Sequence, residues 1–379
     1  MNILITGSGF FGSVLAERIA ADAGQPVTVI DRRNHIGGNC WSEMDMQTGV
    51  EYHKYGSHIF HTSNPTVWKY ISGFTQFNDY RHTVWTSYRN HVYSMPINLG
   101  TINAYYGKNL TPAEARAFII AEAEGENINT PQNLEDKAIS LIGRPLYEAF
   151  IRGYTIKQWE KDPRELSAHI ITRLPVRYTY NNRYFADTHE GIPLEGYGAI
   201  FKKMLAHPNI TVRLNTDFST LRPLDANTLL CWTGAIDEFF NYRLGRLEWR
   251  TVDFEMERPD TPDFQGTSVM NYADVDVPYT RIHEFKHYHP ERPDTGSTLI
   301  FKEYSRFAQE GDEPYYPVDT LNNRELFAKY QELAKHETPN VIFGGRLGHY
   351  KYYDMDNAIE AALRCYHEEV LPRLRSGVA

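Results

Sequence analysis

The sequence predicts an α/β protein, because two apolar runs near the N-terminus each lead directly into a glycine-containing turn. Gly7-Ser8-Gly9-Phe10-Phe11-Gly12 follows Ile3-Leu4-Ile5, and Asp31 follows the run at 27–30. Strand, glycine turn, helix, strand and acid in this order are typical of a Rossmann-like dinucleotide-binding unit. The glycines allow a tight turn, and the helix N-terminus faces a pyrophosphate with free N–H groups. We therefore expect a bound dinucleotide; the alternative is a glycine-rich turn without a ligand.

A second glycine turn favours FAD over NAD as that dinucleotide. Gly37-Gly38 follows the arginines Arg32 and Arg33, and flavoproteins often bring a second glycine turn to the same pyrophosphate. Asp31 lies where a carboxylate can accept from a ribose hydroxyl. The chain contains only one dinucleotide fingerprint, which argues against an NAD(P)H-dependent flavin reductase.

Beyond residue 75 the pattern changes twice. Residues 82–88 and 91–95 predict a hairpin, and 96–159 are helical, with helix starts at Thr111-Pro112 and at Asn133. Strand signals return at 176–180, 210–214, 229–234 and 341–346. Residues 248–305 alternate as antiparallel strands do, and 356–371 predict a closing helix. The nucleotide domain is therefore expected to be discontinuous, with other domains inserted into it.

We expect three domains from this order. The FAD-binding domain comprises residues 1–77, 190–247 and 317–379. A helical bundle is inserted at 98–160. An antiparallel sheet that faces the substrate combines 78–97, 161–189 and 248–316.

Bulk properties exclude several classes of function. The 379 residues suffice for two or three domains. A net charge of −9 opposes binding to nucleic acid or anionic lipid. Cys40, Cys231 and Cys365 are far apart and form no CxxC pair, which argues against a disulfide framework or a zinc site. No leader or apolar stretch of membrane-spanning length is present, so we expect a cytoplasmic protein without a membrane span.

Arginines and aromatic residues are the candidates for binding an anionic ligand. Arg173, Arg281 and Arg346 can each present a planar fork to phosphate oxygens, although an arginine in a strand is more often a surface or ion-pair residue. Tyrosines at 154, 184, 316 and 352 can donate to phosphate or fill the core. Trp159 can stack on a base or pack in a core.

No residues for acid–base or metal chemistry are apparent. His58 and His61 are spaced i,i+3, but no third ligand has suitable spacing, so we predict no metal and expect structural or cofactor-contacting histidines. The sequence contains no GxSxG elbow, P-loop or HExxH motif.

Several strings together resemble bacterial UDP-galactopyranose mutases, nearly from end to end of the chain. The matching strings are residues 7–12, 35–39, 55–62, 181–187, 269–272, 278–284 and 344–348.

The resemblance implies an FAD-dependent isomerase that interconverts UDP-galactopyranose and UDP-galactofuranose without net redox change and is active when the flavin is reduced. Flavin N5 would attack the anomeric carbon. The resemblance also implies a six-stranded antiparallel sheet, a homodimer, a cellular flavin reductant and a role in cell-wall polysaccharide biosynthesis.

Residue roles carry over by motif match. Arg173 and Arg281 would bind the diphosphate, with Arg173 on a mobile segment that ends near Gly153 and Pro175, and His61 would lie near the flavin. The implied substrate-binding residues are Phe150, Tyr154, Thr155, Trp159, Arg173, Tyr184, Asn271, Arg281, Tyr316, Tyr352 and Asp354. The implied cofactor-binding residues are Gly7, Gly9, Phe10, Phe11, Gly12, Asp31, Arg32, Gly38, Asn39, His58, Val212, Arg346 and Asp354.

Departures from the family pattern leave other activities open. They are Cys40-Trp41, His189, Gly198, Trp232 and Ala235. A sister mutase acting on a dTDP-linked 6-deoxy sugar or UDP-N-acetylgalactosamine is one alternative. The others are an FAD-dependent oxidoreductase and a non-catalytic FAD or sugar-nucleotide binding protein.

Overall fold

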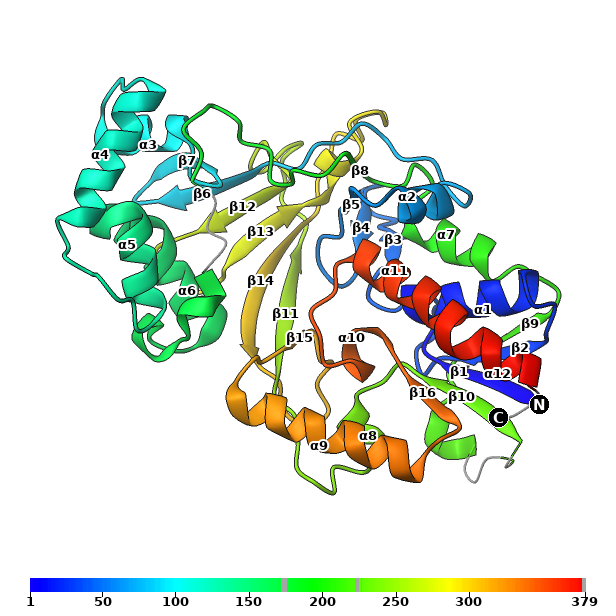
Figure 1. Cartoon of the computed structure of the whole chain (residues 1–379). Helices are drawn as coiled ribbons and strands as arrows, with labels where there is room; N and C mark the ends of the chain where they lie inside the picture. Colours follow the sequence, from blue (N-terminus) through cyan, green and yellow to red (C-terminus); the bar gives the residue numbers. More distant parts are fainter. Residues whose placement is uncertain (172–175, 222–224, 226, 377–379) are drawn as a thin grey trace.

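The computed structural model describes residues 1–171, 176–221, 225 and 227–376 (Figure 1). Figure 1 shows a group of helices, a long twisted sheet beside it, and an α/β part that contains both ends of the chain. The predicted fold class is confirmed.

The α/β part is built on a five-stranded parallel sheet of order β16-β10-β1-β2-β9. Its strands are β1 (Asn2–Thr6), β2 (Val27–Ile30), β9 (Ile210–Arg213), β10 (Thr228–Trp232) and β16 (Val341–Phe343). The three central strands are mostly buried, which suits their apolar runs, because a parallel sheet is covered on both faces. Helices α1 (Phe10–Ala21) and α11 (Met355–Cys365) pack side by side, so segments from both ends of the chain share one core.

The second sheet has seven strands in the order β15-β11-β14-β13-β12-β6-β7, so the expected six-stranded antiparallel sheet is wrong in two respects. Its strands are β6 (Val84–Tyr88), β7 (His91–Met95), β11 (Trp249–Glu257), β12 (Val269–Tyr272), β13 (Arg281–Glu284), β14 (Ile300–Phe307) and β15 (Tyr316–Pro317). The two-residue β15 adds a strand at one edge. The predicted hairpin of β6 and β7 forms the other edge of the sheet, where β6 pairs with β12 in parallel orientation.

The helical group contains α3 (Leu99–Tyr106), α4 (Pro112–Glu124), α5 (Leu134–Leu146), a π-helix (Tyr147–Arg152) and α6 (Gly153–Trp159). Both predicted helix starts are confirmed. Thr111 forms a capping box with Glu114. The Asn133 side chain accepts from the Asp136 N–H. Residues 176–180, which were expected to form a strand, lie in irregular structure. The Arg177 N–H donates to the Ile97 carbonyl oxygen, and the Leu99 N–H donates to the Thr179 carbonyl oxygen.

Two contacts fix α6 against the seven-stranded sheet. A Cβ added at Gly153 would lie 2.1 Å from the Ala273 carbonyl oxygen, so only glycine permits this approach. Arg250, 1% exposed, donates to Glu160 Oε2 and to the Gln158 carbonyl oxygen, each at 2.8 Å. Gly153 therefore packs closely against the sheet, and the mobile segment expected to end near it stays a prediction. Pro175 lies outside the described residues.

The remaining elements belong to all three parts of the molecule. They are α2 (Pro65–Ile71), α7 (Tyr197–Met204), α8 (Ile236–Phe239), α9 (Leu321–Glu337), α10 (Gly345–Gly348), α12 (Leu371–Ser376), the short strands β3 (Ser42–Met44), β4 (Glu51–His53), β5 (Phe60–Thr62) and β8 (His189–Gly191), a second π-helix (Tyr366–Val370), and 3-10 turns at Pro163–Glu165, Ala168–Ile171, Phe218–Leu221 and Phe285–Tyr288. The 3-10 turns at Pro163–Glu165 and Ala168–Ile171 pack against α5 of the helical group. The predicted closing helix corresponds to α11, the second π-helix and α12. The sequence analysis missed α9, since only Asn323 and Tyr330 are buried along it and its apolar pattern is weak. Within the described ranges, no helix combines the length and the apolar character needed to cross a bilayer.

Candidate cofactor and substrate site

A cavity of about 820 Å³ lies at the carboxyl ends of β1, β2 and β10, where ligands bind in open α/β sheets. Every predicted cofactor residue except Val212 lines it. These residues are Gly7, Gly9, Phe10, Phe11, Gly12, Asp31, Arg32, Gly38, Asn39, His58, Arg346 and Asp354. Val212 instead packs against the core beneath the parallel sheet.

The two glycine turns meet in this cavity without side chains between them. A Cβ added at Gly38 would lie 3.1 Å from Gly9 Cα, and Gly38 has φ +57. A Cβ at Gly12 would lie 2.0 Å from the Gly7 carbonyl oxygen. The backbone at the N-terminus of α1 is thus open to a diphosphate, so the cradle fits a dinucleotide.

The Asp31 carboxylate fixes the first glycine turn. Its Oδ2 accepts from the Ser8 N–H at 2.9 Å and the Ser8 hydroxyl at 2.6 Å, and Oδ1 accepts from the Arg33 N–H at 3.0 Å. This positions the turn, while the role of Asp31 toward a ribose stays a prediction.

Residues 307–314 form a wall of the cavity that the sequence analysis missed. Glu313 in this segment pairs with Arg32 at 2.7 Å and with Arg33 at 3.0 Å. The Arg33 guanidinium lies 4.4 Å from the centroid of the Tyr55 ring. No motif marks this segment, because it reaches the cavity from the second sheet through tertiary contacts.

His58 and Cys40 are kept uncharged at the cavity. The His58 Nδ1–H donates to the Gly56 carbonyl oxygen at 2.7 Å, and burial lowers the pKa of His58 to about 4. Burial also raises the pKa of the Cys40 thiol to about 12. His58 therefore presents a neutral imidazole, and Cys40 is not a thiolate nucleophile at neutral pH.

His61, on β5, has contacts that differ from those of His58. Its Nδ1 lies 2.8 Å from Asp187 Oδ2, and its ring stacks on Phe185 at 3.7 Å between centroids. Asp187 lies in the 181–187 string, but the sequence analysis gave it no role. The contact fixes the orientation of the His61 ring, as a carboxylate commonly does for a functional histidine.

A row of three polar residues crosses the central strands of the second sheet. Asn271 on β12 pairs with Arg281 on β13, which pairs with Glu303 on β14, so their side chains share one face. Arg281 also donates to the Tyr154 hydroxyl from α6. The Asn271 Oδ1 atom is buried and lacks a hydrogen-bond partner among the described residues. Such an orphaned atom indicates a place where a polar ligand group is accommodated.

An aromatic cluster connects this row with the cavity. The Tyr316 and Tyr352 rings stack at 5.6 Å, and the Arg346 guanidinium lies 5.8 and 5.6 Å from their centroids. Tyr184 is 49% and Tyr352 54% exposed. Burial lowers the pKa of Arg281, but Glu303 and the tyrosines 154, 316 and 184 raise it above its usual value. Tyr154, Tyr184 and Tyr316 therefore lie near Arg281, and Tyr352 is connected to them by its stacking on Tyr316.

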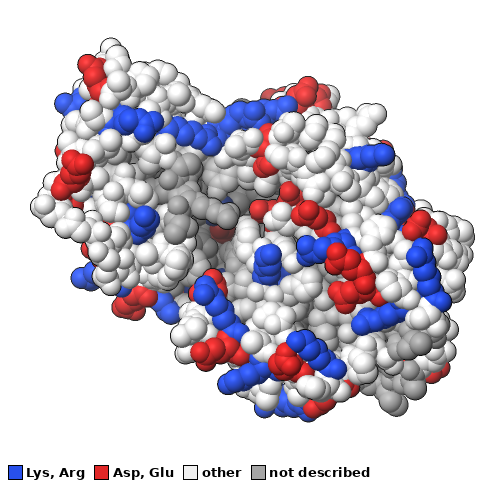
Figure 2. Space-filling view, in the orientation of Figure 1, with Lys and Arg blue, Asp and Glu red and all other residues white. Residues whose placement is uncertain are grey.

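The implied substrate-binding residues Phe150, Thr155 and Trp159 lie on the first π-helix and α6. Phe150 is 4% exposed and packs edge-on to Tyr88 and Tyr93, so its ring belongs to a core. Thr155 is buried, whereas Trp159 is half-buried. Figure 2 shows a hollow between the helical group and the α/β part, with a row of Lys and Arg side chains along its upper rim. Arg173 lies outside the described residues.

The departures from the family pattern have local packing reasons. A Cβ at Gly198 would lie 2.8 Å from the Trp41 ring, which itself stacks on His35, so a large residue at 41 accompanies a small one at 198. The Trp232 indole donates to the Ala235 carbonyl oxygen at 3.0 Å. The His189 ring stacks on the Trp68 indole at 4.1 Å.

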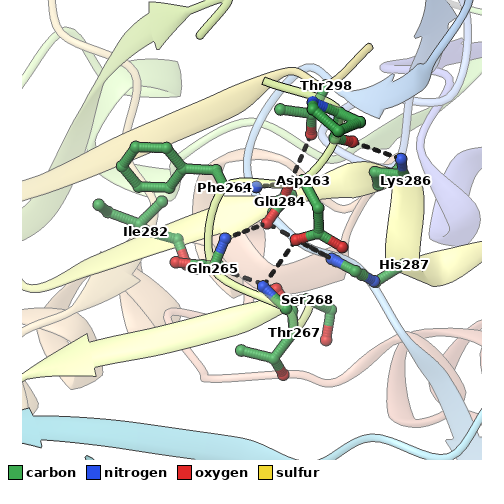
Figure 3. Close-up of polar contacts among 12 residues, drawn as sticks. Asp263, Phe264, Gln265, Thr267, Ser268, Ile282, Glu284, Lys286, His287 and Thr298 are labelled. Carbon is green, nitrogen blue, oxygen red and sulfur yellow. Dashed lines mark hydrogen bonds and ion pairs between the residues drawn. The ribbon is translucent and has the colours of Figure 1, made fainter. Parts of the chain in front are cut away.

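Asp263, Glu284 and His287 are the one group with metal-ligand geometry within the described part of the chain. Figure 3 shows that the Glu284 oxygens are already used: they accept from the Phe264 and Gln265 N–H groups at 2.8 Å and from the Thr298 hydroxyl at 2.6 Å. His287 Nε2 lies 3.4 Å from Glu284 Oε2. These hydrogen bonds join the segment at residues 264–265 to Glu284, the last residue of β13, without requiring an ion.

The protonation of His287 is expected to make stability depend on pH. Burial lowers the pKa of His287, but Glu284 and Asp263 outweigh burial and raise it above its ordinary 6.5. The folded protein therefore holds the proton more tightly, and this stabilisation is present below the unfolded pKa and lost as pH rises through the folded pKa. His287→Gln is expected to lower Tm more at about pH 5.5 than at about pH 8.5. His336→Gln, at an exposed position on α9, is the control; an equal loss at both pH values for His287→Gln would contradict the prediction.

Comparison with known proteins gives consistent results across the chain. A sequence model of the UDP-galactopyranose mutase family matches residues 149–352, and one of NAD(P)-binding Rossmann-like domains matches residues 5–74. A dTDP-fucopyranose mutase of Escherichia coli is 42% identical over 368 residues, which cover 96% of this chain and 97% of the relative. A probable UDP-galactopyranose mutase of Klebsiella pneumoniae is 44% identical, with coverage of 97% and 94%. The UDP-galactopyranose mutase of Mycoplasma pneumoniae is 31% identical, with coverage of 96% and 94%.

Solved structures share the fold. A reduced UDP-galactopyranose mutase superposes with a TM-score of 0.74 at 16% identity, covering 98% of this chain and 94% of the other. A putative protoporphyrinogen oxidase from Exiguobacterium superposes with a TM-score of 0.66 at 11% identity, covering 98% and 99%. At these identities the likeness concerns the fold alone.

Proposed function

Because this chain belongs to the UDP-galactopyranose mutase family, we propose that it interconverts UDP-galactopyranose and UDP-galactofuranose with FAD as its cofactor. Membership places it among the isomerases. The observation that carries the proposal is the placement of Arg281 and Asn271 on one face of the second sheet, with Tyr154 of α6 in contact with Arg281. The cluster around Arg346 joins this face to the dinucleotide cavity.

The cavity and its glycine cradle are proposed to hold FAD. Gly9, Gly38 and the start of α1 would bind the pyrophosphate, and Arg346 and His58 would lie toward the flavin. When bound and reduced, FAD supplies the nucleophile, N5, for the anomeric carbon. The neutral His58 adds no positive charge to that end of the site.

Arg281 and the tyrosines are proposed to bind and stabilise the diphosphate. Parts of these side chains are shielded from water, and a charge-assisted hydrogen bond to phosphate is stronger there than at the surface. Negative charge grows on the diphosphate as the sugar–phosphate bond breaks, and donors fixed in advance stabilise it without reorganisation. Arg281 is suited to this role, since its partners hold its side chain before substrate arrives.

The second candidate function is a sister mutase acting on a dTDP-linked 6-deoxy sugar. It is supported by the relative named dTDP-fucopyranose mutase, whose 42% identity is close to the 44% of the probable UDP-galactopyranose mutase. UDP-N-acetylgalactosamine is a further substrate to be tested. The residues proposed to bind the diphosphate and the flavin would serve all these substrates equally. The contacts to the base and the sugar would therefore decide which substrate is used.

Chromatography of the nucleotide sugars tests these proposals. The protein, reduced with dithionite under anaerobic conditions, is incubated with UDP-galactopyranose, dTDP-fucopyranose or UDP-N-acetylgalactosamine. We expect furanose product from UDP-galactopyranose, no turnover by the oxidised enzyme and no reductant consumed per product. Preferential turnover of the dTDP sugar would establish the sister activity, and stoichiometric oxygen consumption would indicate an oxidase. A dimer, the cytoplasmic location and the identity of the cellular reductant stay predictions.

Trp159→Ala is expected to weaken UDP binding about 5- to 150-fold, because stacking of an aromatic side chain on a base contributes roughly 1–3 kcal/mol. Titration calorimetry with UDP on the FAD-bound enzyme measures the effect. Trp159→Phe, which keeps an aromatic face, is the matched control and should retain most of the affinity. Unchanged UDP affinity in Trp159→Ala would assign the indole to the helical core that it partly contacts.

A further inference from the structure

A buried chain of polar side chains runs from Arg281 along the same face of the second sheet to Ser57. Arg281 Nε lies 3.2 Å from Glu303 Oε1, and His283 Nε2 lies 2.9 Å from Glu303 Oε2. His283 Nδ1 lies 2.5 Å from the Ser57 hydroxyl oxygen, which also contacts the Tyr288 hydroxyl. His283 is 1% and Glu303 6% exposed, so water does not compete for these contacts.

One arrangement of protons satisfies the whole chain. Glu303 is ionised, since the Arg281 charge and the hydrogen bonds of His283 and Thr280 outweigh the effect of burial and lower its pKa to about 2. A carboxylate only accepts, so the proton of His283 is on Nε2 and its Nδ1 accepts from Ser57. Ser57 in turn accepts from Tyr288. Burial lowers the pKa of His283, which keeps the ring neutral in this tautomer.

The chain joins two parts of the site that are distant in sequence. Arg281 and His283 are two residues apart on β13, so both side chains lie on one face of the sheet. Ser57 directly precedes His58, which lines the dinucleotide cavity. A shift of the 56–58 segment would therefore act on His283 and, through Glu303, on Arg281.

We propose that His283 is a positioning residue for the diphosphate-binding arginine: its Nε2–H holds the Glu303 carboxylate against Arg281, and its bond to Ser57 ties that carboxylate to the segment at the cofactor cavity. This inference rests on the proposed function, because it assumes that Arg281 binds the diphosphate. Without the donor from His283, one buried Glu303 oxygen loses a partner, and the carboxylate rotates to use the Arg281 fork that otherwise faces the substrate.

The test measures UDP affinity of the FAD-bound, full-length enzyme by calorimetry in a double-mutant cycle. The variants are His283→Leu, His283→Gln, Arg281→Ala and the double variant Arg281→Ala with His283→Leu. His283→Leu is expected to weaken UDP binding about tenfold, a coupling of ordinary size for neighbours in one network. His283→Gln keeps an amide donor for Glu303 and an acceptor for Ser57, so its loss should be within about threefold.

In the Arg281→Ala background, His283→Leu is expected to weaken UDP binding by less than about twofold, because a residue that acts through the arginine has nothing left to position. The Kd for FAD, whose pyrophosphate is expected at the glycine turns of residues 7–12 and 37–38, should not change and reports intact folding. A purely structural role would instead give the same loss in both backgrounds, or a matching loss of FAD affinity; either result overturns the proposal, as does wild-type UDP affinity in His283→Leu.

Two further outcomes separate this inference from the proposed function. If Arg281→Ala alone leaves UDP affinity unchanged, the arginine assignment is wrong. If Arg281→Ala weakens UDP binding and His283→Leu does not, only the positioning role is wrong. Should His283→Leu fail to fold, Ser57→Ala leaves the His283–Glu303 contact in place and removes its support. That variant is expected to show a smaller loss, again absent in the Arg281→Ala background, and equal losses in both backgrounds would overturn the proposal.

Discussion

Arg281→Ala is expected to lower kcat/KM for the mutase reaction by about 30- to 5,000-fold, the equivalent of roughly 2–5 kcal/mol for a buried charge that loses its partner. Arg281 is held by Glu303 and Tyr154 on the face that also carries Asn271. The substitution removes the fork proposed to bind the diphosphate and leaves the Glu303 carboxylate without its cation. The remaining negative charge then repels the substrate.

Steady-state kinetics of the reduced enzyme, with product separated by chromatography, measures this effect. Arg164→Ala is the matched control, because the Arg164 side chain is 67% exposed and its ion-pair partner is Asp162. Flavin absorbance and Tm of both variants show whether each is folded. Wild-type kcat/KM in Arg281→Ala would remove this residue from the site. The same loss is predicted for Arg173→Ala, on sequence grounds alone.

Gly38→Ala is expected to reduce FAD affinity by at least about tenfold, corresponding to roughly 1.4 kcal/mol. Its Cβ would lie 3.1 Å from Gly9 Cα, and Gly38 and Gly9 both line the cavity. The methyl group therefore occupies the place where the two turns open to the diphosphate. The left-handed φ of +57 adds strain of about 1–2 kcal/mol for any residue with a side chain.

A glycine elsewhere separates steric closure of the cradle from backbone strain. Gly266 has φ +69 and nothing within 4 Å of an added Cβ, so Gly266→Ala carries the strain without the obstruction. Both variants should lose stability to a similar degree, whereas only Gly38→Ala should lose FAD, measured by absorbance after gel filtration and by titration of the apoprotein. Equal FAD affinity in the two variants would show that the second glycine turn does not contact the cofactor.

The dinucleotide cavity was largely predictable from the sequence, because its determinants are local. Glycines that need positive φ or close approach, a helix that begins directly after a strand, and apolar runs long enough for buried strands are each visible within a few residues. The helix starts at Thr111 and Asn133 were predictable for the same reason: a cap and its partner lie three residues apart. Arg281, Tyr154 and Tyr184 were candidates for anion binding by residue type, whereas Asn271 and the specific role of each residue came through resemblance. These roles await the tests above.

Contacts between distant segments were decided by the tertiary structure. No local pattern brings Glu313 over Arg32 and Arg33, or Asp187 to His61, or Ser57 to His283, which are 226 residues apart. The seventh strand and the parallel β6–β12 pair have the same origin, since β6 is a complete hairpin strand by its own sequence and gains a second neighbour only through folding. Strand propensity and turns are properties of neighbouring residues, whereas the order of strands depends on which apolar faces cover one another. The sequence by itself therefore determined the nucleotide-binding unit and the element types, and the packing of α6 against β12, β13 and β14 decided which polar side chains meet around Arg281.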